Sequence, residues 1–151
     1  MRRKIITDVE YLHRKQEAIE YHKSLETLKT MKMFMLINKN LADKTLGLAS
    51  NQLGLEGRVI LYRADTKHNF KHLINPTLET YKNTDTIQTI EQCLSVPNVS
   101  ILVKRYKSIV VQSYTTPLNW EYSHPTLSEG LVIQHEVDHL DGILMIDKEV
   151  K

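Results

Sequence analysis

Apolar residues recur at steps of three and four positions in the first third of the chain, which is the spacing of one face of an α-helix. The apolar positions of this stripe are Leu25, Leu28, Met31 and Met35. Thr7 and Glu10 stand ahead of it at the spacing of a helix-capping box. The pattern therefore predicts one or two helices over residues 8 to 42.

From residue 46 to about residue 122 the pattern changes to short runs rich in Val, Ile, Thr and Tyr. The clearest runs are "RVILYRA", "SILVKRY" and "SIVVQSY", and Asn, Pro and Gly lie between them. Such runs, bounded by turn residues, are typical of strands. We therefore expect an antiparallel β region here, and a single domain of the α+β class over residues 1 to 151.

Another helix is predicted near the end of the sequence. "HPTLSEG" interrupts the strands, and Thr126 and Glu129 have capping-box spacing immediately ahead of "LVIQHEVDHL". Gly142 follows where a C-terminal cap is expected. Residues at steps of three and four should form the inward face of this helix. These residues are Leu127, Leu131, His135, Asp138 and His139.

Length and charge narrow the class of protein. A chain of 151 residues can bury one core without disulfides. Its 20 basic and 18 acidic residues are intermixed, so no basic surface for nucleic acid or an anionic membrane is expected. The N-terminus has no apolar signal region, no apolar run could cross a bilayer, and the single Cys93 cannot form an internal disulfide. We expect a cytoplasmic monomer with no nucleic-acid or membrane partner.

The candidate chemistry begins with "IQHEVDHLDGIL", which contains the pattern H-E-x-x-H. On a helix, His135 and His139 are one turn apart and point the same way, so both imidazoles can bind one metal ion. Glu136 lies between them and is close enough to transfer a proton. A catalytic site of this kind needs a third protein ligand and an open position for water.

The third ligand is expected upstream of this helix. The extended metalloprotease pattern requires a histidine where this chain has Met145. Proteases that use a glutamate on a following helix need more than the 12 residues that follow His139. Cys93 lies in a strand-like segment that could pack against the helix, and its thiolate would complete a three-ligand site. The upstream candidates are the carboxylates and Cys93, His13, His22, His68, His72 and His124.

Three segments together resemble the signature motifs of the peptide deformylase family. "LGLASNQLG", "IEQCLSVP" and "IQHEVDHLDG" occur in the order and approximate spacing of G-x-G-L-A-A-x-Q, E-G-C-L-S and Q-H-E-x-D-H. The resemblance extends from about residue 25 to residue 146, and the third motif is matched completely. In the other two motifs, Thr45 and Gln92 stand in place of glycines and Ser50 in place of an alanine.

The resemblance implies a metal-dependent hydrolase. Cys93, His135 and His139 would be the metal ligands, and Glu136 would act as the general base and acid. The family resemblance implies Fe²⁺ in the cell, with Zn²⁺, Ni²⁺ or Co²⁺ as possible replacements. The implied reaction removes the formyl group from the N-terminal formylmethionine of nascent polypeptides.

The same resemblance implies which residues meet the substrate. Gln52 and the backbone N–H of Leu94 would stabilise the oxyanion that forms when water attacks the formyl carbonyl. An unbranched apolar pocket would receive the methionine side chain, with His135 at its edge. The substrate-binding residues would be Leu46, Gly47, Gln92, Leu131 and Val132.

Arg105 stands at the spacing where the family has an arginine. We expect it to pair with Asp138, because an unpaired inward carboxylate is costly. Gln92 replaces a glycine that would permit a positive φ, so its backbone conformation decides whether the site is strained. The remaining histidines are expected to be surface or structural residues.

The chain resembles the short family members known from phages, without the C-terminal helix that many bacterial members use to dock on the ribosome. We therefore expect an enzyme of the bacterial cytoplasm, or of the host cytoplasm if a phage encodes it. It would act near the ribosome without that docking helix. Two alternatives stay open: a catalytically inactive homologue that binds formylated chains, and an H-E-x-x-H metallopeptidase of another architecture.

Overall fold

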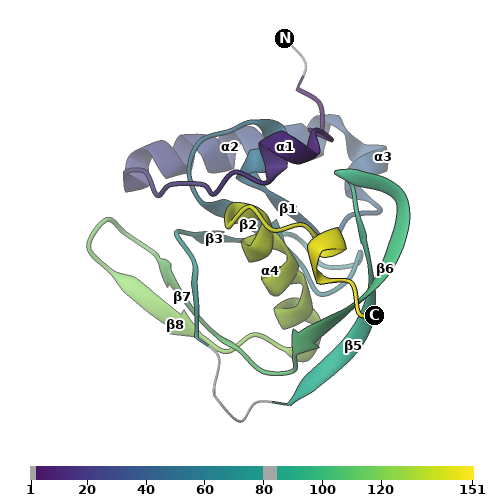
Figure 1. The fold of residues 1–151 in the computed structure, drawn as a ribbon. Helices are drawn as coiled ribbons and strands as arrows, with labels where there is room; N and C mark the ends of the chain where they lie inside the picture. Colours follow the sequence, from purple (N-terminus) through teal and green to yellow (C-terminus); the bar gives the residue numbers. More distant parts are fainter. Residues whose placement is uncertain (1–2, 80–84) are drawn as a thin grey trace.

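The protein is described here from a computed structural model that covers residues 3–79 and 85–151 (Figure 1). Its helical elements are α1 (Val9–Leu12), α2 (Tyr21–Ile37), α3 (Lys39–Ala42), η1 (Ser50–Leu53), α4 (Leu127–Leu140) and η2 (Met145–Lys148). Its strands are β1 (Gly47–Ala49), β2 (Val59–Tyr62), β3 (Lys71–Ile74), β4 (Thr77–Glu79), β5 (Thr86–Cys93), β6 (Val96–Tyr106), β7 (Val110–Tyr114) and β8 (Trp120–Ser123). They form antiparallel sheets in the orders β1-β2-β3, β4-β7-β8 and β5-β6. The α+β class and the antiparallel region are confirmed.

The N-terminal helical region is more divided than the sequence predicts, because α1, α2 and α3 stand in place of one or two helices. Asp8, not Thr7, caps α1, since its carboxylate accepts a hydrogen bond from the N–H of Tyr11. Tertiary contacts then keep the segment between α1 and α2 from forming a helix. The N–H of Gln16 donates to the carbonyl of Leu140 at the end of α4, so it is not available to an N-terminal helix.

The buried face of α2 is also displaced from the expected stripe. Leu28, Met31 and Met35 are buried as predicted, but Leu25 is 42% exposed. Ser24 takes the inward place in that turn and donates its hydroxyl to the carbonyl of Glu20. A small polar residue with a local backbone partner can be buried at little cost, and apolar periodicity alone does not detect it.

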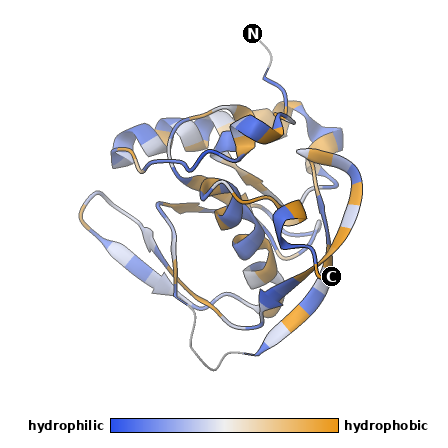
Figure 2. Cartoon of the chain, viewed as in Figure 1, coloured by the Kyte–Doolittle hydropathy of each residue, from blue (hydrophilic) through white to orange (hydrophobic). Residues whose placement is uncertain are grey.

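The sheet β1-β2-β3 packs between two helices. All of β2 is buried, and its side chains alternate between two clusters. Val59 and Leu61 pack with the buried face of α2, whereas Ile60 and Tyr62 pack with Ile133, Val137 and Leu140 of α4. A strand that is covered on both faces has no polar side, which explains the unbroken run "VILY". Figure 2 shows the strands behind α4 largely in the hydrophobic colour, while the exposed β8 is pale and blue.

Helix α4 begins and ends as the sequence predicts. The hydroxyl of Thr126 accepts from the N–H of Glu129, and the carboxylate of Glu129 accepts from the N–H of Thr126. At the other end Gly142 has φ +74°, and the N–H groups of Gly142 and Ile143 donate to carbonyls of the last helical turn. The prediction that Leu127 faces inward is wrong, because this residue is 45% exposed.

The middle of α4 is buried on every side, from Ile133 to Val137. In the view of Figure 1, α4 runs between the β7–β8 hairpin and the long β5–β6 ribbon, and it contacts β1, β2 and β6. Such a helix holds its side chains in fixed places against three strands. Within the described residues, no helix is both long and apolar enough to cross a membrane.

Candidate metal centre

Cys93, His135 and His139 meet where the end of β5 lies against α4. Their ligand atoms all lie within 4.8 Å of one another, and Cys93 Sγ is 3.2 Å from His139 Nε2. Metal bonds of about 2.1–2.3 Å in a tetrahedral site place neighbouring ligand atoms about 3.4–3.8 Å apart. Two imidazoles and one thiolate at this separation can therefore hold one ion, and they leave a fourth position for water or substrate.

The expected third ligand is thus beside the two histidines. The histidines that were alternative candidates lie elsewhere: His13 contacts Asp147, His22 contacts Glu20, and His68 contacts Asp65. His72 is in β3 and His124 follows β8. Among the described residues, Cys93, His135 and His139 are the group whose atoms could share a metal.

Each histidine of the cluster has a distinct environment. His135 Nδ1 lies 2.8 Å from Glu91 Oε1, which leaves Nε2 as the nitrogen that could bind a metal. Burial alone would lower the pKa of His135, but the contacts with Cys93 and Glu91 raise it to about 10. Burial, His135 and Arg105 hold the pKa of His139 well below its usual value. His139 is therefore neutral and ready to bind a metal, whereas at His135 a metal must displace a proton.

Arg105 joins the cluster to Asp138. Its guanidinium donates to Glu91 at 2.7 and 2.8 Å and to Asp138 at 2.5 Å, and it is 3% exposed. The expected pair of Arg105 and Asp138 is therefore present. Burial alone would raise the pKa of Glu91, but the hydrogen bonds from Arg105 and His135 lower it to about 2. Glu91 is thus a carboxylate at neutral pH and fixes the ring of His135.

Glu136 faces Gly47 of β1, and the missing side chain of this glycine gives the carboxylate its room. A Cβ atom on Gly47 would lie 2.6 Å from Glu136 Oε1 and 2.8 Å from Val132 Cγ1. Glu136 Oε2 is buried without a hydrogen-bond partner among the described residues. Burial raises the pKa of Glu136 to about 7, although nearby His135 acts to lower it. A carboxyl with this pKa can both accept and release a proton near neutral pH.

Gln52 approaches the cluster from η1, immediately after β1. Its Oε1 accepts from the N–H of Ala49 at 2.9 Å, and its Nε2 donates to Ser95 Oγ at 3.1 Å. The same Nε2 lies 3.7 Å from Cys93 Sγ. Leu94 follows Cys93 in the two-residue turn that joins β5 to β6. Both donors expected for an oxyanion therefore lie next to Cys93, the candidate metal ligand.

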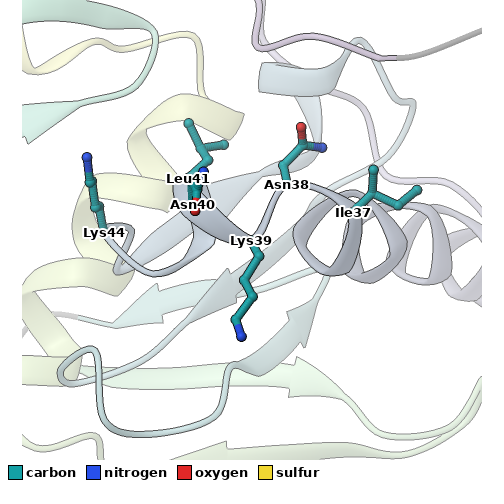
Figure 3. A pocket seen from close by; sticks show the side chains of 6 residues that line it. All are labelled: Ile37, Asn38, Lys39, Asn40, Leu41 and Lys44. Carbon is teal, nitrogen blue, oxygen red and sulfur yellow. The ribbon is translucent and has the colours of Figure 1, made fainter.

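An open hollow elsewhere in the protein is separate from this cluster. It lies at the junction of α2 and α3, where Lys39 points away from Lys44 and Asn38 (Figure 3). Its lining residues are Ile37, Asn38, Lys39, Asn40, Leu41 and Lys44. None of them belongs to the candidate centre.

Comparison with known proteins now identifies the family. The family model described as polypeptide deformylase matches residues 3–151. This chain belongs to the polypeptide deformylase family. The whole arrangement of β5, α4 and η1 around the cluster falls within the matched region.

Individual deformylases cover the chain to different extents. Peptide deformylase 1 of Corynebacterium glutamicum is 32% identical over 155 residues, which cover 96% of this chain and 84% of that protein. The peptide deformylase of Acidothermus cellulolyticus is 36% identical over 108 residues, and this match covers 68% of the chain but only 55% of that relative's length.

Solved structures of deformylases match the fold across almost the whole chain. The Thermotoga maritima structure has a TM-score of 0.80 at 25% identity and covers 100% of this chain and 99% of its own. A probable peptide deformylase from Synechococcus phage S-SSM7 has a TM-score of 0.79 at 31% identity, with 97% of this chain and 99% of its own covered.

The three departures from the deformylase motifs are accommodated locally. Among the described residues, positive φ angles outside glycine occur at Asn75 and Asn98, so Gln92 does not need the conformation that a glycine permits. Its side chain donates to Ser100 Oγ at 2.9 Å across the hairpin. The buried hydroxyls of Thr45 and Ser50 donate to the carbonyls of Leu41 and Gly57.

The residues expected at the substrate are only partly brought together. Val132 contacts Gly47 beside Glu136, whereas Leu46 is 38% exposed and Gln92 is held by Ser100. Leu131 is half-buried. The substrate pocket therefore stays a proposal.

Glu91 and Ser95 were missed by the sequence analysis. Both lie in the quoted segment "IEQCLSVP". Glu91 stands two positions before Cys93 in β5, so its side chain points to the same face of the strand. That alternation could have assigned it to the cluster. Ser95 is the last residue of the segment matched to E-G-C-L-S, but its contact with Gln52 depends on the tertiary fold.

Proposed function

We propose that this protein is a metal-dependent hydrolase that removes the formyl group from N-formylmethionine at the start of nascent polypeptides. The observation that carries the proposal is the meeting of Cys93, His135 and His139 beside Glu136 and Gln52 in a member of the deformylase family. The catalytically inactive homologue and the unrelated metallopeptidase are alternatives that the assay below distinguishes.

The donor set fits a divalent transition metal. A thiolate and two imidazoles suit Fe²⁺ or Zn²⁺, and we propose Fe²⁺ as the physiological ion, with Zn²⁺, Ni²⁺ or Co²⁺ as replacements. When bound, such an ion lowers the pKa of water and polarises a carbonyl oxygen. Cys93, His135 and His139 would hold it. Glu91 and Arg105 would keep His135 in the binding orientation.

Glu136 is the proposed proton carrier. Its carboxylate would take a proton from the attacking water and later give it to the departing amine. Burial brings its pKa to about 7, which suits both transfers. Gly47 leaves the space in which Oε1 lies, so the carboxylate is held against β1 rather than turned to solvent.

Gln52 and Leu94 are proposed to stabilise the negative oxygen that develops during attack. Both groups donate hydrogen bonds and carry no charge, so they do not compete with the thiolate for the metal. Fixed donors of this kind typically contribute about a hundredfold to a thousandfold in rate. Leu94 would contribute its backbone N–H from the turn that follows Cys93.

The substrate proposal follows from the family and from apolar residues near Glu136. The methionine side chain would lie against Leu46, Leu131 and Val132, and the start of the peptide would run past Gly47 and Gln92. Nascent chains are made in the cytoplasm, so we place the protein there, transiently close to ribosomes. We propose that it acts as a monomer.

The decisive experiment uses protein purified without oxygen and loaded with Fe²⁺. We expect formate release from a formyl-methionyl dipeptide and no reaction with the unformylated dipeptide. Cleavage of the amide bond in the unformylated peptide would instead support a metallopeptidase. Metal-replete protein that does neither would support a binding homologue.

Glu136→Gln tests the proton carrier in the same assay. The variant should bind metal stoichiometrically but lose at least about a hundredfold in kcat, since general acid–base catalysis contributes about a hundredfold to ten-thousandfold. Glu121→Gln on the exposed strand β8 makes the same chemical change away from the centre and should leave kcat unchanged. Full activity of Glu136→Gln would remove Glu136 from the mechanism.

A further inference from the structure

Ser95 lies beside the candidate centre, next to Gln52 and two positions after Cys93. It is 2% exposed, and its hydroxyl oxygen accepts a hydrogen bond from Gln52 Nε2 at 3.1 Å. We infer that Ser95 is a positioning residue that fixes the side-chain amide of Gln52 for oxyanion stabilisation. The inference rests on the proposed function, because it assigns Ser95 a part in the same reaction.

The two ends of the Gln52 amide are held by partners of opposite kinds. Oε1 accepts from the N–H of Ala49 at 2.9 Å, whereas Nε2 faces Ser95 Oγ and Cys93 Sγ. Rotating the amide by half a turn would place Oε1 beside the sulfur and bring the NH₂ group against the N–H of Ala49. The contact with Ala49 would then be repulsive, because two donors would face each other. The contacts therefore specify one orientation, with the NH₂ group toward the metal ligands.

Ser95 holds one of the two Nε2 hydrogens. The second hydrogen faces Cys93 Sγ, a weak acceptor that lies 3.7 Å from Nε2. That hydrogen is therefore available to a negatively charged oxygen of the substrate without movement of the amide. Without Ser95, Ala49 would still hold Oε1, but the nitrogen end would have no firm partner.

Ser95 occupies a fixed place because of the β5–β6 hairpin. Cys93 pairs with Val96, so Leu94 and Ser95 form the turn between them. One tight turn thus presents the metal-binding thiolate, the proposed backbone donor of Leu94 and the anchor of Gln52. A donor that is fixed before the reaction does not have to be reoriented as charge develops.

The first test compares kcat and KM of Ser95→Ala with those of the wild type. Kcat should fall by about tenfold to a hundredfold, less than the loss of a whole oxyanion donor, while KM changes less than about threefold. Ser24→Ala removes an equally buried hydroxyl from α2 and should leave both constants unchanged. An unchanged kcat in Ser95→Ala would overturn the proposal. Ser95→Gly replaces the alanine variant if that one does not fold.

A double-mutant cycle separates positioning from a merely structural role. If Ser95 acts through Gln52, then adding Ser95→Ala to Gln52→Leu should lower kcat by less than about twofold. A structural role would lower kcat by the same factor in both backgrounds, and that result would overturn the proposal.

A measurement without turnover uses ¹⁵N-labelled protein loaded with Zn²⁺. The side-chain NH₂ signals of Gln52 are identified by their loss in Gln52→Leu. Their hydrogen exchange should accelerate at least about tenfold in Ser95→Ala and stay unchanged in Ser24→Ala. Unchanged exchange in Ser95→Ala would overturn the anchoring. If the wild type releases no formate, the proposed function fails, and these signals still decide whether Ser95 fixes Gln52.

Discussion

Gly47 gives Glu136 its place because it has no side chain. In Gly47→Ala the new methyl group would lie 2.6 Å from Glu136 Oε1, so the carboxylate must move. We expect kcat to fall by about tenfold or more with metal binding retained, since displaced catalytic groups commonly cost factors of this size. Steady-state kinetics and metal analysis measure both effects.

Gly130→Ala is the matched control for that change. A Cβ atom there would meet Ile109 at 3.6 Å, which is ordinary van der Waals contact. Alanine also favours a helix over glycine by up to about 1 kcal/mol. Kcat should therefore be unchanged and the free energy of unfolding unchanged or higher. Equal activity losses in both variants would contradict the close approach at Gly47.

Arg105 neutralises two carboxylates that the fold places around the metal cluster. In Arg105→Met, Glu91 and Asp138 would lose their buried partner, and the free energy of unfolding should fall by about 3–5 kcal/mol. The adjacent Lys104 points to the exposed face of β6, so Lys104→Met should change stability little. Urea denaturation compares the two variants. Equal stability of both would show that the carboxylates do not need Arg105.

At the level of elements, the start of α4 carries an ion pair that should make stability depend on pH. The hydrogen bond from Lys71 lowers the pKa of Glu129 despite a partial opposing effect of burial. Glu129 therefore stays ionised in the folded protein where the unfolded chain would take up a proton. This contribution to stability is complete above the ordinary glutamate pKa of 4.5 and is lost as pH falls through the lowered value.

Glu129→Gln should therefore reduce the loss of stability between neutral pH and about pH 3. Glutamine preserves the capping box with Thr126, so the change isolates the charge of the pair with Lys71. Glu121→Gln on β8 should show the wild-type pH dependence. Unfolding midpoints in denaturant at several pH values provide the measurement. Identical pH profiles for wild type and Glu129→Gln would exclude this role.

The elements were predictable where local signals agree with the tertiary fold. The caps of α4 were read correctly because Thr126, Glu129 and Gly142 act within one turn of the helix ends. The non-helical segment before α2 was not predicted, because the backbone N–H of Gln16 donates to the carbonyl of the distant residue Leu140. Tertiary hydrogen bonds of this kind leave no periodic trace in the sequence.

For the whole molecule, the metal should act as a link between separate parts of the chain. Its proposed ligands come from β5 and from α4, so binding stabilises only the folded state. With free metal at about a hundredfold above its Kd, the stabilisation is about 2.7 kcal/mol. Chelation should then lower the thermal midpoint by about 5–10 °C for a chain of this size.

Cys93→Ala supplies the comparison for the chelation experiment. This variant lacks one of the three ligands, so a chelator should leave its midpoint unchanged. Melting curves by circular dichroism, recorded without oxygen, measure both proteins. The same midpoint for metal-loaded and metal-free wild type would contradict the linking role.

For the centre as a whole, the sequence predicts that Cys93, His135 and His139 come together, but not all of the contacts that surround them. H-E-x-x-H on a capped helix names His135 and His139, and the motif around Cys93 names the third residue. The contact of Ser95 with Gln52 and the space at Gly47 depend on how η1 and β1 meet β5 and α4. Such packing cannot be read from one sequence, because many arrangements share the same pattern of apolar positions.

The contacts around α4 join residues that are far apart along the chain. Asn51 donates to the carbonyl of His139, Arg58 pairs with Asp141, and His13 contacts Asp147. The long chain segments between these partners must close into loops before the contacts form, which slows folding relative to small helical proteins. A peptide that contains only "IQHEVDHLDGIL" has two of the three proposed ligands and lacks the distant partners of these contacts. High-affinity metal binding should therefore appear late during refolding, together with the native core and not before it.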